Sequence, residues 1–311
     1  MKAVGFSRFG GPEVLEVLDL PVPEPGASEV RVRVAAATVN PTDIGMRSGG
    51  RGGALEQLPK PYVAGMELAG TVDAVGSGAA WQVGERVLGI ALPMQSGRGA
   101  QSEYTVVPAD SLVRIPDEVS FEQAATLAMN GLTARRALDM MGLAAGQVLA
   151  VTGAAGAVGG YAIQLGVADG LRVIAISSAS DEPLVRGLGA DEFVPRGAEF
   201  ASQVRALVPA GADGMVDAAV IGAPALAAIR DGGHLACVRG FEGQPERGIH
   251  VHQVRVSEYA HNQAALQKLA DMVKSGALTL RVAETFPPSR AAEAQQKLQV
   301  GGVRGRLVIV F

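Results

Sequence analysis

The chain is poor in the residues that mark several large classes of protein. Its 311 residues contain one cysteine, Cys237, and aromatic residues make up only 4%. A single cysteine excludes a disulfide within the chain and indicates a reducing compartment, so we expect a cytoplasmic protein. No apolar run approaches the length that crosses a membrane, and the start of the chain has no apolar signal core.

An excess of basic charge is also missing. Lysine and arginine total 27 against 31 acidic residues, which gives a net charge of -4 and a pI near 5.7. The chain therefore has no electrostatic footprint for nucleic acid or for a membrane surface, and neither is expected as a partner. With 48% hydrophobic and 19% charged residues it is globular, and its length allows two domains.

The most informative stretch is QVLAVTGAAGAVGGYAIQL, residues 147–165. An apolar run at 148–151 is typical of a strand buried on both faces of a parallel sheet. Gly153, Gly156 and Gly159 follow at three-residue spacing, and a helical pattern resumes at Ala157. A strand that turns through glycines into a helix directs free N–H groups and the positive helix end at one place, which suits a phosphate. The commoner fingerprint is G-x-G-x-x-G, so a tight turn that binds nothing is the alternative.

Short, valine-rich segments separated by glycine and proline dominate the first part of the chain. They predict strands at 14–18, 30–34, 69–75, 86–90 and 104–107. We expect a compact, barrel-like antiparallel unit. Residues 49–53, with Arg51 among glycines, predict a flexible loop.

After Pro116 the pattern changes to alternating strands and helices. Ser120 and Gln123 form a capping box that predicts a helix through Leu127. The expected strands are 148–151, 171–176, 193–194, 214–218 and 234–238. The expected helices are 157–167, 183–188, 199–207 and 224–229. This alternation predicts a doubly wound parallel sheet with right-handed crossovers.

The last part of the chain loses that rhythm. Residues 249–256, IHVHQVRV, alternate and predict an edge strand, which must be covered or paired. Pairing with its own copy across a two-fold axis would make a homodimer. Helices at 264–274 and 291–298 and a strand at 307–311 are expected to return to the first domain.

Several ordered motifs resemble one known family. The matching residues are Val39-Asn40-Pro41-Thr42-Asp43, Gly65-Met66-Glu67-Leu68-Ala69-Gly70-Thr71-Val72, Val75-Gly76, Gly84-Glu85-Arg86-Val87, Asn130-Gly131-Leu132-Thr133-Ala134, the glycine turn, and Leu188-Gly189-Ala190-Asp191. The chain resembles zinc-independent members of the medium-chain dehydrogenase/reductase superfamily, in the quinone oxidoreductase (zeta-crystallin-like) branch. The resemblance runs through the whole chain, and the family's glycine turn has this same three-residue spacing.

The resemblance implies an α/β protein in two parts. A GroES-like, β-barrel-like substrate domain would comprise residues 1–117 and 262–311, and a doubly wound Rossmann domain, 118–261, would bind NADPH. It places the active site in the cleft between them, which agrees with ligands binding beyond the carboxyl ends of parallel strands.

The resemblance also bears on metal. Zinc alcohol dehydrogenases of this superfamily have cysteine at the position of Asn40 and histidine at that of Met66, and neither residue here can serve as such a ligand. Glu67 alone does not make a site. His234, His250, His252 and His261 cluster in the sequence, and we interpret them as structural or surface residues. No metal is expected.

The expected cofactor-binding residues lie just after the strands of the second domain or match the motifs of the family. They are Asn130, Thr133, Gly153, Ala154, Ala155, Gly156, Ala157, Val158, Ser177, Ser178, Arg196, Val220, Val238, Arg239, Gly240 and Phe241. NAD-selective sheets end the second strand in a carboxylate, whereas serine hydroxyls at that place can donate to a 2′-phosphate.

The choice between NADPH and NADH depends on three residues. Ser177 and Arg196 favour a phosphate. Asp181 stands where many relatives have lysine, and we expect it to point to solvent, so that NADPH is favoured. The alternative is that Ser177 is a helix cap, Asp181 a first-turn acid and Arg196 a solvated loop residue.

Without a Lewis acid, alcohols are poor substrates, and quinones or α,β-unsaturated carbonyl compounds are the natural hydride acceptors. Asn40, Asp43 and Thr133 are the catalytic candidates, with Asn40 donating to a substrate oxygen. The competing interpretation makes Asn40 and Asp43 turn residues around Pro41, and Thr133 a helix residue. The alternative functions are an enoyl-thioester reductase and a non-catalytic NADPH-binding redox sensor.

Overall fold

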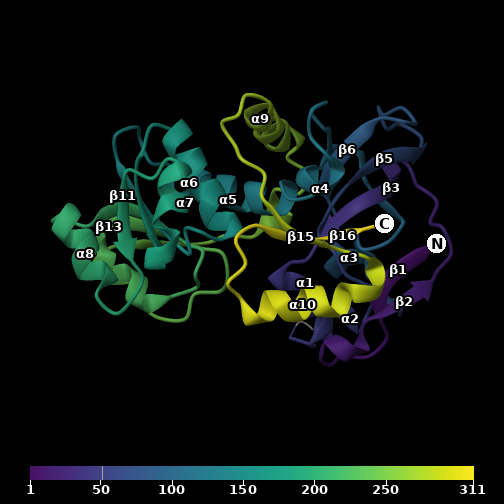
Figure 1. Cartoon of the computed structure of the whole chain (residues 1–311), viewed down its shortest axis with the longest axis horizontal. Coiled ribbons are helices and arrows are strands. Elements are labelled where there is room, and N and C mark those ends of the chain that lie inside the picture. The colour runs from purple at the N-terminus through teal and green to yellow at the C-terminus, as the bar shows by residue number, and fades with distance from the viewer. Residues whose placement is uncertain (51) are drawn as a thin grey trace. The chain divides into compact units, whose positions relative to one another are not determined.

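The computed structural model describes residues 1–50 and 52–311, which form two compact units (Figure 1). Unit 1 comprises Met1–Met129, Ala260–Lys274 and Leu280–Phe311, and unit 2 comprises Asn130–Tyr259 and Ser275–Thr279. Residues 118–129 thus belong with unit 1, whereas the family resemblance implies a second domain that begins at residue 118.

Unit 1 is built on β-sheets whose strands are nearly all antiparallel. The strands are β1 (Lys2–Phe6), β2 (Glu16–Asp19), β3 (Glu29–Thr38), β4 (Tyr62–Val63), β5 (Glu67–Val75), β6 (Arg86–Ile90), β7 (Tyr104–Pro108), β8 (Leu112–Arg114), β15 (Val282–Phe286) and β16 (Arg306–Val310). One sheet has the order β2-β1-β4, and the other β15-β16-β3-β5-β6-β8, with β7 also paired to β3. The C-terminal strand β16 lies antiparallel to β3, so the chain does return to its first part (Figure 1).

Short helices connect and cover these strands. They are α1 (Pro41–Arg47), α2 (Gly52–Leu55), α3 (Pro93–Ser96), α4 (Phe121–Ala124), α9 (Gln263–Lys274) and α10 (Ala291–Val300), with single 3-10 turns η1 (Pro12–Val14), η2 (Ala109–Ser111) and η6 (Pro288–Arg290). The predicted capping box is confirmed, because Gln123 N donates to Ser120 Oγ at 3.3 Å and Ser120 N donates to Gln123 Oε1 at 3.2 Å.

Several expectations for this part were wrong. The strand expected from Val14 begins at Glu16, because Pro12 starts a 3-10 turn. The helix after Ser120 ends at Ala124, and α5 (Ala128–Met141) follows as a separate helix that the pattern missed. The loop expected at 49–53 is interrupted by α2 from Gly52; Arg51 lies outside the described residues.

Unit 2 is a parallel sheet in the order β11-β10-β9-β12-β13-β14, which confirms the doubly wound prediction. Its strands are β9 (Val148–Thr152), β10 (Arg172–Ser177), β11 (Glu192–Pro195), β12 (Ala212–Asp217), β13 (Ile229–Cys237) and β14 (His250–Gln253). Its helices, with the 3-10 turns, are α5 from Asn130 on, α6 (Ala157–Ala168), η3 (Ala179–Asp181), α7 (Glu182–Gly187), α8 (Phe200–Leu207), η4 (Ala223–Ala228) and η5 (Val256–Glu258). The α-helix expected at 224–229 is the 3-10 segment η4, which Gly222 precedes at a φ of 74°.

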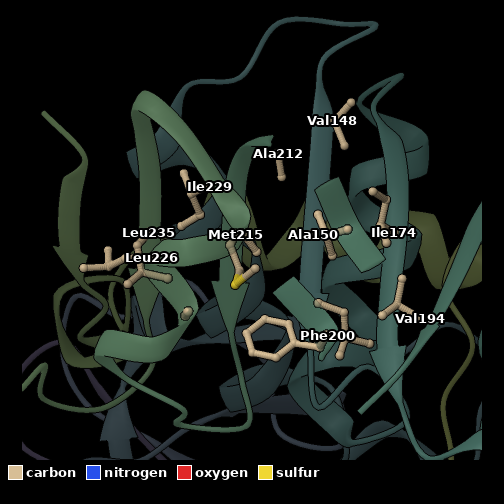
Figure 2. Packing of buried hydrophobic residues seen from close by; sticks show 14 of the residues in the cluster. Val148, Ala150, Ile174, Val194, Phe200, Ala212, Met215, Leu226, Ile229 and Leu235 are labelled. Carbon is tan, nitrogen blue, oxygen red and sulfur yellow. The ribbon is translucent and has the colours of Figure 1, made fainter. Parts of the chain in front are cut away.

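One face of this sheet carries a hydrophobic core cluster of unit 2 (Figure 2). Side chains from neighbouring strands, among them Ala150, Ile174 and Met215, gather around Phe200 of α8 and Leu226 of η4. Every residue of β9 is buried, as its continuous apolar run predicts. Among the helices described, none combines the length and the apolar character needed to span a membrane.

Candidate functional site

The glycine turn after β9 requires the absence of side chains. Gly153 has a φ of 58°, and a Cβ there would lie 3.0 Å from the backbone nitrogen of Ala219. A Cβ on Gly159 would lie 2.3 Å from the carbonyl oxygen of Gly153. Helix α6 begins directly after Gly156, so its first N–H groups have no partner within the helix. The turn therefore presents backbone donors and the positive helix end to a ligand that can approach closely.

The other predicted turn residues hold that backbone in place. Ala154 and Ala155 are buried, whereas Ala157 and Val158 are half-buried in the first turn of α6. Ala154 N donates to the carbonyl of Ile176 at 3.3 Å, which ties the turn to the neighbouring strand β10.

The ends of β10 and β11 bring Ser177 and Arg196 together. Arg196 N donates to the carbonyl of Ser177 at 2.7 Å. Ser177 is only 5% exposed, and its hydroxyl has no hydrogen-bond partner within the described residues. Ser178 is half-buried, and the Arg196 side chain is exposed. A buried hydroxyl without a partner, in a residue whose backbone is bound to that of an exposed arginine, suits an anionic ligand group.

The expectation that Asp181 points to solvent is wrong. Asp181 ends the 3-10 turn η3, precedes the first residue of α7, and is 8% exposed. The interpretation of this residue as an acid at the start of a helix agrees with its place, because the positive end of α7 favours a carboxylate there.

Helix α5 carries Asn130 and Thr133 at a spacing that puts them on one side of the helix. Both residues are buried, at 5% and 6% exposure. Nδ2 of Asn130 has no hydrogen-bond partner among the described residues. A buried amide with an unused donor is costly unless a ligand or water accepts from it.

The remaining cofactor candidates follow β12 and β13. Val220 is 44% exposed and has a φ of 58°. Val238 and Phe241 are half-buried, and Arg239 and Gly240 are exposed. Because the strands are parallel, their carboxyl ends, and these segments with them, lie at the same edge of the sheet as the glycine turn.

In unit 1, Asn40 and Asp43 form the N-terminal cap of α1. Asn40 N donates to Asp43 Oδ2 at 2.8 Å, Gly65 N donates to Asp43 Oδ1 at 3.1 Å, and Gln101 Nε2 donates to Oδ2 at 3.3 Å. Burial raises the pKa of Asp43 to about 7, although the two backbone donors oppose this shift. This geometry fits the turn interpretation of the pair.

The Asn40 amide is fully occupied inside unit 1. Its Nδ2 donates to Thr38 Oγ1 at 3.2 Å and to Glu67 Oε1 at 3.3 Å, and its Oδ1 accepts from Arg306 at 2.8 Å. The residue has no exposed surface. Donation from Asn40 to a substrate therefore requires that one of these bonds be broken, and a catalytic role for Asn40 stays a prediction.

Glu67 is the centre of this network. Its Oε1 accepts from Arg306 and Thr38, and its Oε2 accepts from Met129 N at 2.9 Å. Glu67 is fully buried and the Arg306 side chain is 6% exposed. The charges are thus paired and hydrogen-bonded, as buried charges must be.

The residues at the expected zinc positions do not fit zinc. Asn40 is committed to the hydrogen bonds above, and Met66 is a buried thioether. No cluster of three metal-binding side chains occurs in the part of the chain that the structure describes. Burial raises the pKa of Cys237 to about 12, so this thiol stays protonated and is a poor ligand.

The histidines of the sheet edge stack on one another. His234 of β13 lies between His250 and His252 of β14, with ring centroids 5.1 Å and 5.3 Å away. Nδ1 of His234 and Nε2 of His252 are 3.0 Å apart, which accounts for a shared hydrogen bond. Burial lowers the pKa of His234 and of His252, so both rings favour the neutral form.

Sequence reasoning missed several residues that organise these sites. Sequence patterns assign no role to Arg306, raise Glu67 only as a possible metal ligand, and assign no role to Thr152 or Asp217. A signal existed for the last two, because each is a buried polar residue at the carboxyl end of an apolar strand.

Comparisons with known proteins match both parts of the chain to one kind of enzyme. Residues 26–117 match the family model for the alcohol dehydrogenase GroES-like domain, and residues 188–309 match that for zinc-binding dehydrogenase. A quinone oxidoreductase of Pseudomonas aeruginosa is 31% identical over 99% of this chain and 99% of its own length. An NADPH-dependent alkenal/one oxidoreductase of Arabidopsis thaliana chloroplasts is 31% identical over 99% of this chain and 79% of its own length.

Solved structures resemble the whole chain. A protein described as an NAD-dependent alcohol dehydrogenase is 32% identical with a TM-score of 0.88, covering 100% of both chains. A mycobacterial protein complexed with NADPH is 29% identical with a TM-score of 0.86, again over 100% of both chains.

Proposed function

This chain belongs to the medium-chain dehydrogenase/reductase superfamily, in its quinone oxidoreductase branch, and we propose that it is an NADPH-dependent reductase of quinones or α,β-unsaturated carbonyl compounds. The observation that carries the proposal is the carboxyl edge of the unit 2 sheet. There a glycine turn, a buried hydroxyl without a partner and an exposed arginine lie at the ends of three neighbouring strands.

The residues at this edge fit a dinucleotide. The backbone N–H groups that begin α6 would hold the pyrophosphate, and the Ser177 hydroxyl and Arg196 guanidinium would bind the 2′-phosphate of NADPH. A carboxylate at the end of β10 would repel that phosphate, and the strand ends in serine instead. When bound, the nicotinamide supplies hydride. The Asn130 side chain, whose Nδ2 donor is unused among the described residues, would with Thr133 bind the ribose or carboxamide end of the nicotinamide.

The substrate class follows from the residues at the metal positions. Because Asn40 and Met66 do not provide zinc ligands, these positions do not form a site for a Lewis acid that would lower the pKa of an alcohol. Quinones and enones already accept hydride, and the protein needs only to position them and to stabilise the oxyanion that develops. We therefore propose zinc-independent catalysis. Asn40 and Asp43 would shape the site by fixing the start of α1.

We also propose a homodimer formed through β14. This strand ends the sheet order and is hydrogen-bonded on one side only, to β13, among the strands described. Pairing of two β14 strands would satisfy the open edge. The single cysteine, held as a buried thiol, is consistent with the cytoplasmic location that we propose.

The proposal is tested by oxidation of NADPH at 340 nm with chelator-treated protein. The acceptors are quinones, small enones and enoyl-coenzyme A esters, with NADH in parallel. We expect turnover of quinones or enones that survives chelation and prefers NADPH. Activity on thioesters alone would favour an enoyl-thioester reductase. Tight NADPH binding with no turnover on any acceptor would favour a redox sensor, and loss of activity on chelation would contradict zinc independence.

A further inference from the structure

A buried carboxylate organises the loop that follows β12. Asp217 is 1% exposed at the end of the strand. Its Oδ1 accepts from Ile221 N at 3.0 Å, and its Oδ2 accepts from Gly222 N at 2.9 Å. Two backbone donors of a five-residue stretch are thus bound to one side chain, which fixes the path of the loop.

Thr152, at the end of the adjacent strand β9, completes this arrangement. Its hydroxyl donates to Asp217 Oδ1 at 2.7 Å and accepts from Ala219 N at 3.1 Å. The loop is therefore bound to the ends of two neighbouring strands, because the N–H groups of Ala219, Ile221 and Gly222 all have side-chain acceptors on Thr152 or Asp217.

The residue that this loop presents is Val220. Its φ of 58° is a left-handed conformation that β-branched residues avoid because of steric repulsion around Cβ. Its neighbour Ile221 packs against the core cluster of unit 2, whereas Val220 is 44% exposed. An apolar side chain is thus held outward at a cost in backbone strain, and strain of this kind collects at ligand sites.

The loop also adjoins the glycine turn. A Cβ on Gly153 would lie 3.0 Å from Ala219 N and 3.1 Å from the carbonyl carbon of Ala218. The backbone of the loop and the backbone that would bind the pyrophosphate are consequently in contact. Thr152 directly precedes the glycine in this turn.

We propose that Asp217, together with Thr152, is a positioning residue that holds Val220 in its left-handed conformation as an apolar contact for the nicotinamide end of the cofactor. This inference rests on the proposed NADPH site and adds the residues that set its nicotinamide half. The adenosine half lies at β10 and β11, so the two halves depend on different side chains.

The test compares binding of two ligands by purified variants. NADPH contains both halves, and adenosine 2′,5′-bisphosphate contains only the adenosine half with its 2′-phosphate. Dissociation constants are measured by calorimetry, and melting temperatures are measured without ligand. The variants are Asp217→Asn, Thr152→Val and Val220→Gly. Thr152→Ser keeps the hydroxyl, and Asp213→Asn removes a carboxylate from the other end of the same strand, where it accepts from Val148 N at 2.8 Å.

We expect Asp217→Asn and Thr152→Val to weaken NADPH about tenfold, which corresponds to about 1.4 kcal/mol. Binding of adenosine 2′,5′-bisphosphate should stay within about twofold of the wild type, a separation that a general loss of folding would not produce. Thr152→Ser should retain wild-type binding, and Asp213→Asn should lower the melting temperature without changing the ratio of the two dissociation constants. Val220→Gly should weaken NADPH while raising the melting temperature, because glycine adopts a φ of 58° without strain.

Two results would overturn the inference while leaving the proposed function intact. One is wild-type binding of NADPH by Asp217→Asn, and the other is an equal loss of both ligands in Asp217→Asn and Thr152→Val. Failure of the wild-type protein to bind either ligand would overturn the NADPH site itself, and the inference with it.

Discussion

Arg306 and Glu67 form an ion pair in the interior of unit 1, although they lie 239 residues apart in the chain. The same Arg306 nitrogen lies within hydrogen-bond distance of Thr38 Oγ1 and of Asn40 Oδ1. The pair therefore joins the C-terminal strand β16 to β3, to β5 and to the start of α1, and it fixes the orientation of the Asn40 amide.

Removing the charge of Glu67 should destabilise the protein strongly. In Glu67→Gln the buried guanidinium of Arg306 loses its counter-charge, and breaking a buried pair in this way costs about 3–5 kcal/mol. Unfolding in urea should show a lower midpoint with an unchanged slope. The control is Glu293→Gln, which breaks the exposed pair with Arg290 and should leave the midpoint where it is. Equal midpoints for wild type and Glu67→Gln would contradict the importance of the buried pair.

Asp43 should make stability depend on pH in a direction opposite to that of a salt-bridged acid. Its pKa is about 7 in the folded protein, above its ordinary value of 3.8, so the folded state holds the proton more tightly than the unfolded state does. The stabilisation is complete below about pH 4 and is lost as the pH rises toward about 7. The free energy of unfolding of wild type minus that of Asp43→Asn should therefore fall across this interval. A difference that does not change with pH would show that burial does not hold the proton.

Arg196 should determine the preference for NADPH. A hydrogen bond to a charged group is worth about 1.5–3 kcal/mol, so Arg196→Ala should raise KM for NADPH about tenfold or more. KM for NADH, which lacks the 2′-phosphate, should change little. Arg172→Ala is the matched control, because Arg172 pairs with Glu192 at the other end of β10. Equal increases in KM for both cofactors would contradict the proposed contact between Arg196 and the 2′-phosphate.

The β14 edge should mediate dimerisation. Val254 N donates to Cys237 O at 2.9 Å toward β13, and backbone groups alternate along a strand, so the N–H of Gln253 points to the open side. Gln253→Pro removes that donor and should yield a monomer, whereas Gln253→Ala should remain a dimer. Light scattering at about micromolar concentration measures both masses. A wild-type protein with the mass of a monomer would contradict the proposed dimer.

The parts of the fold that sequence predicted best are those with short-range signals. The buried strand β9, the glycine turn and the capping box at Ser120 are each specified by residues within a few positions of one another. The missed helix α5 has mixed polar and apolar residues around its circumference, so its periodicity was weak. The strand expected at Val14 failed because Pro12 favours a turn there.

The sequence by itself determined the family, the alternation of strands and helices in unit 2, and the kind of turn that a phosphate can approach. The tertiary structure alone decided that Asp181 is buried, that Asn40 is bound by Arg306, and that Val220 is left-handed above Asp217. The physical reason is that burial and strain depend on which distant residues pack against a site. The local sequence pattern does not identify those partners, because the chain brings them together only on folding.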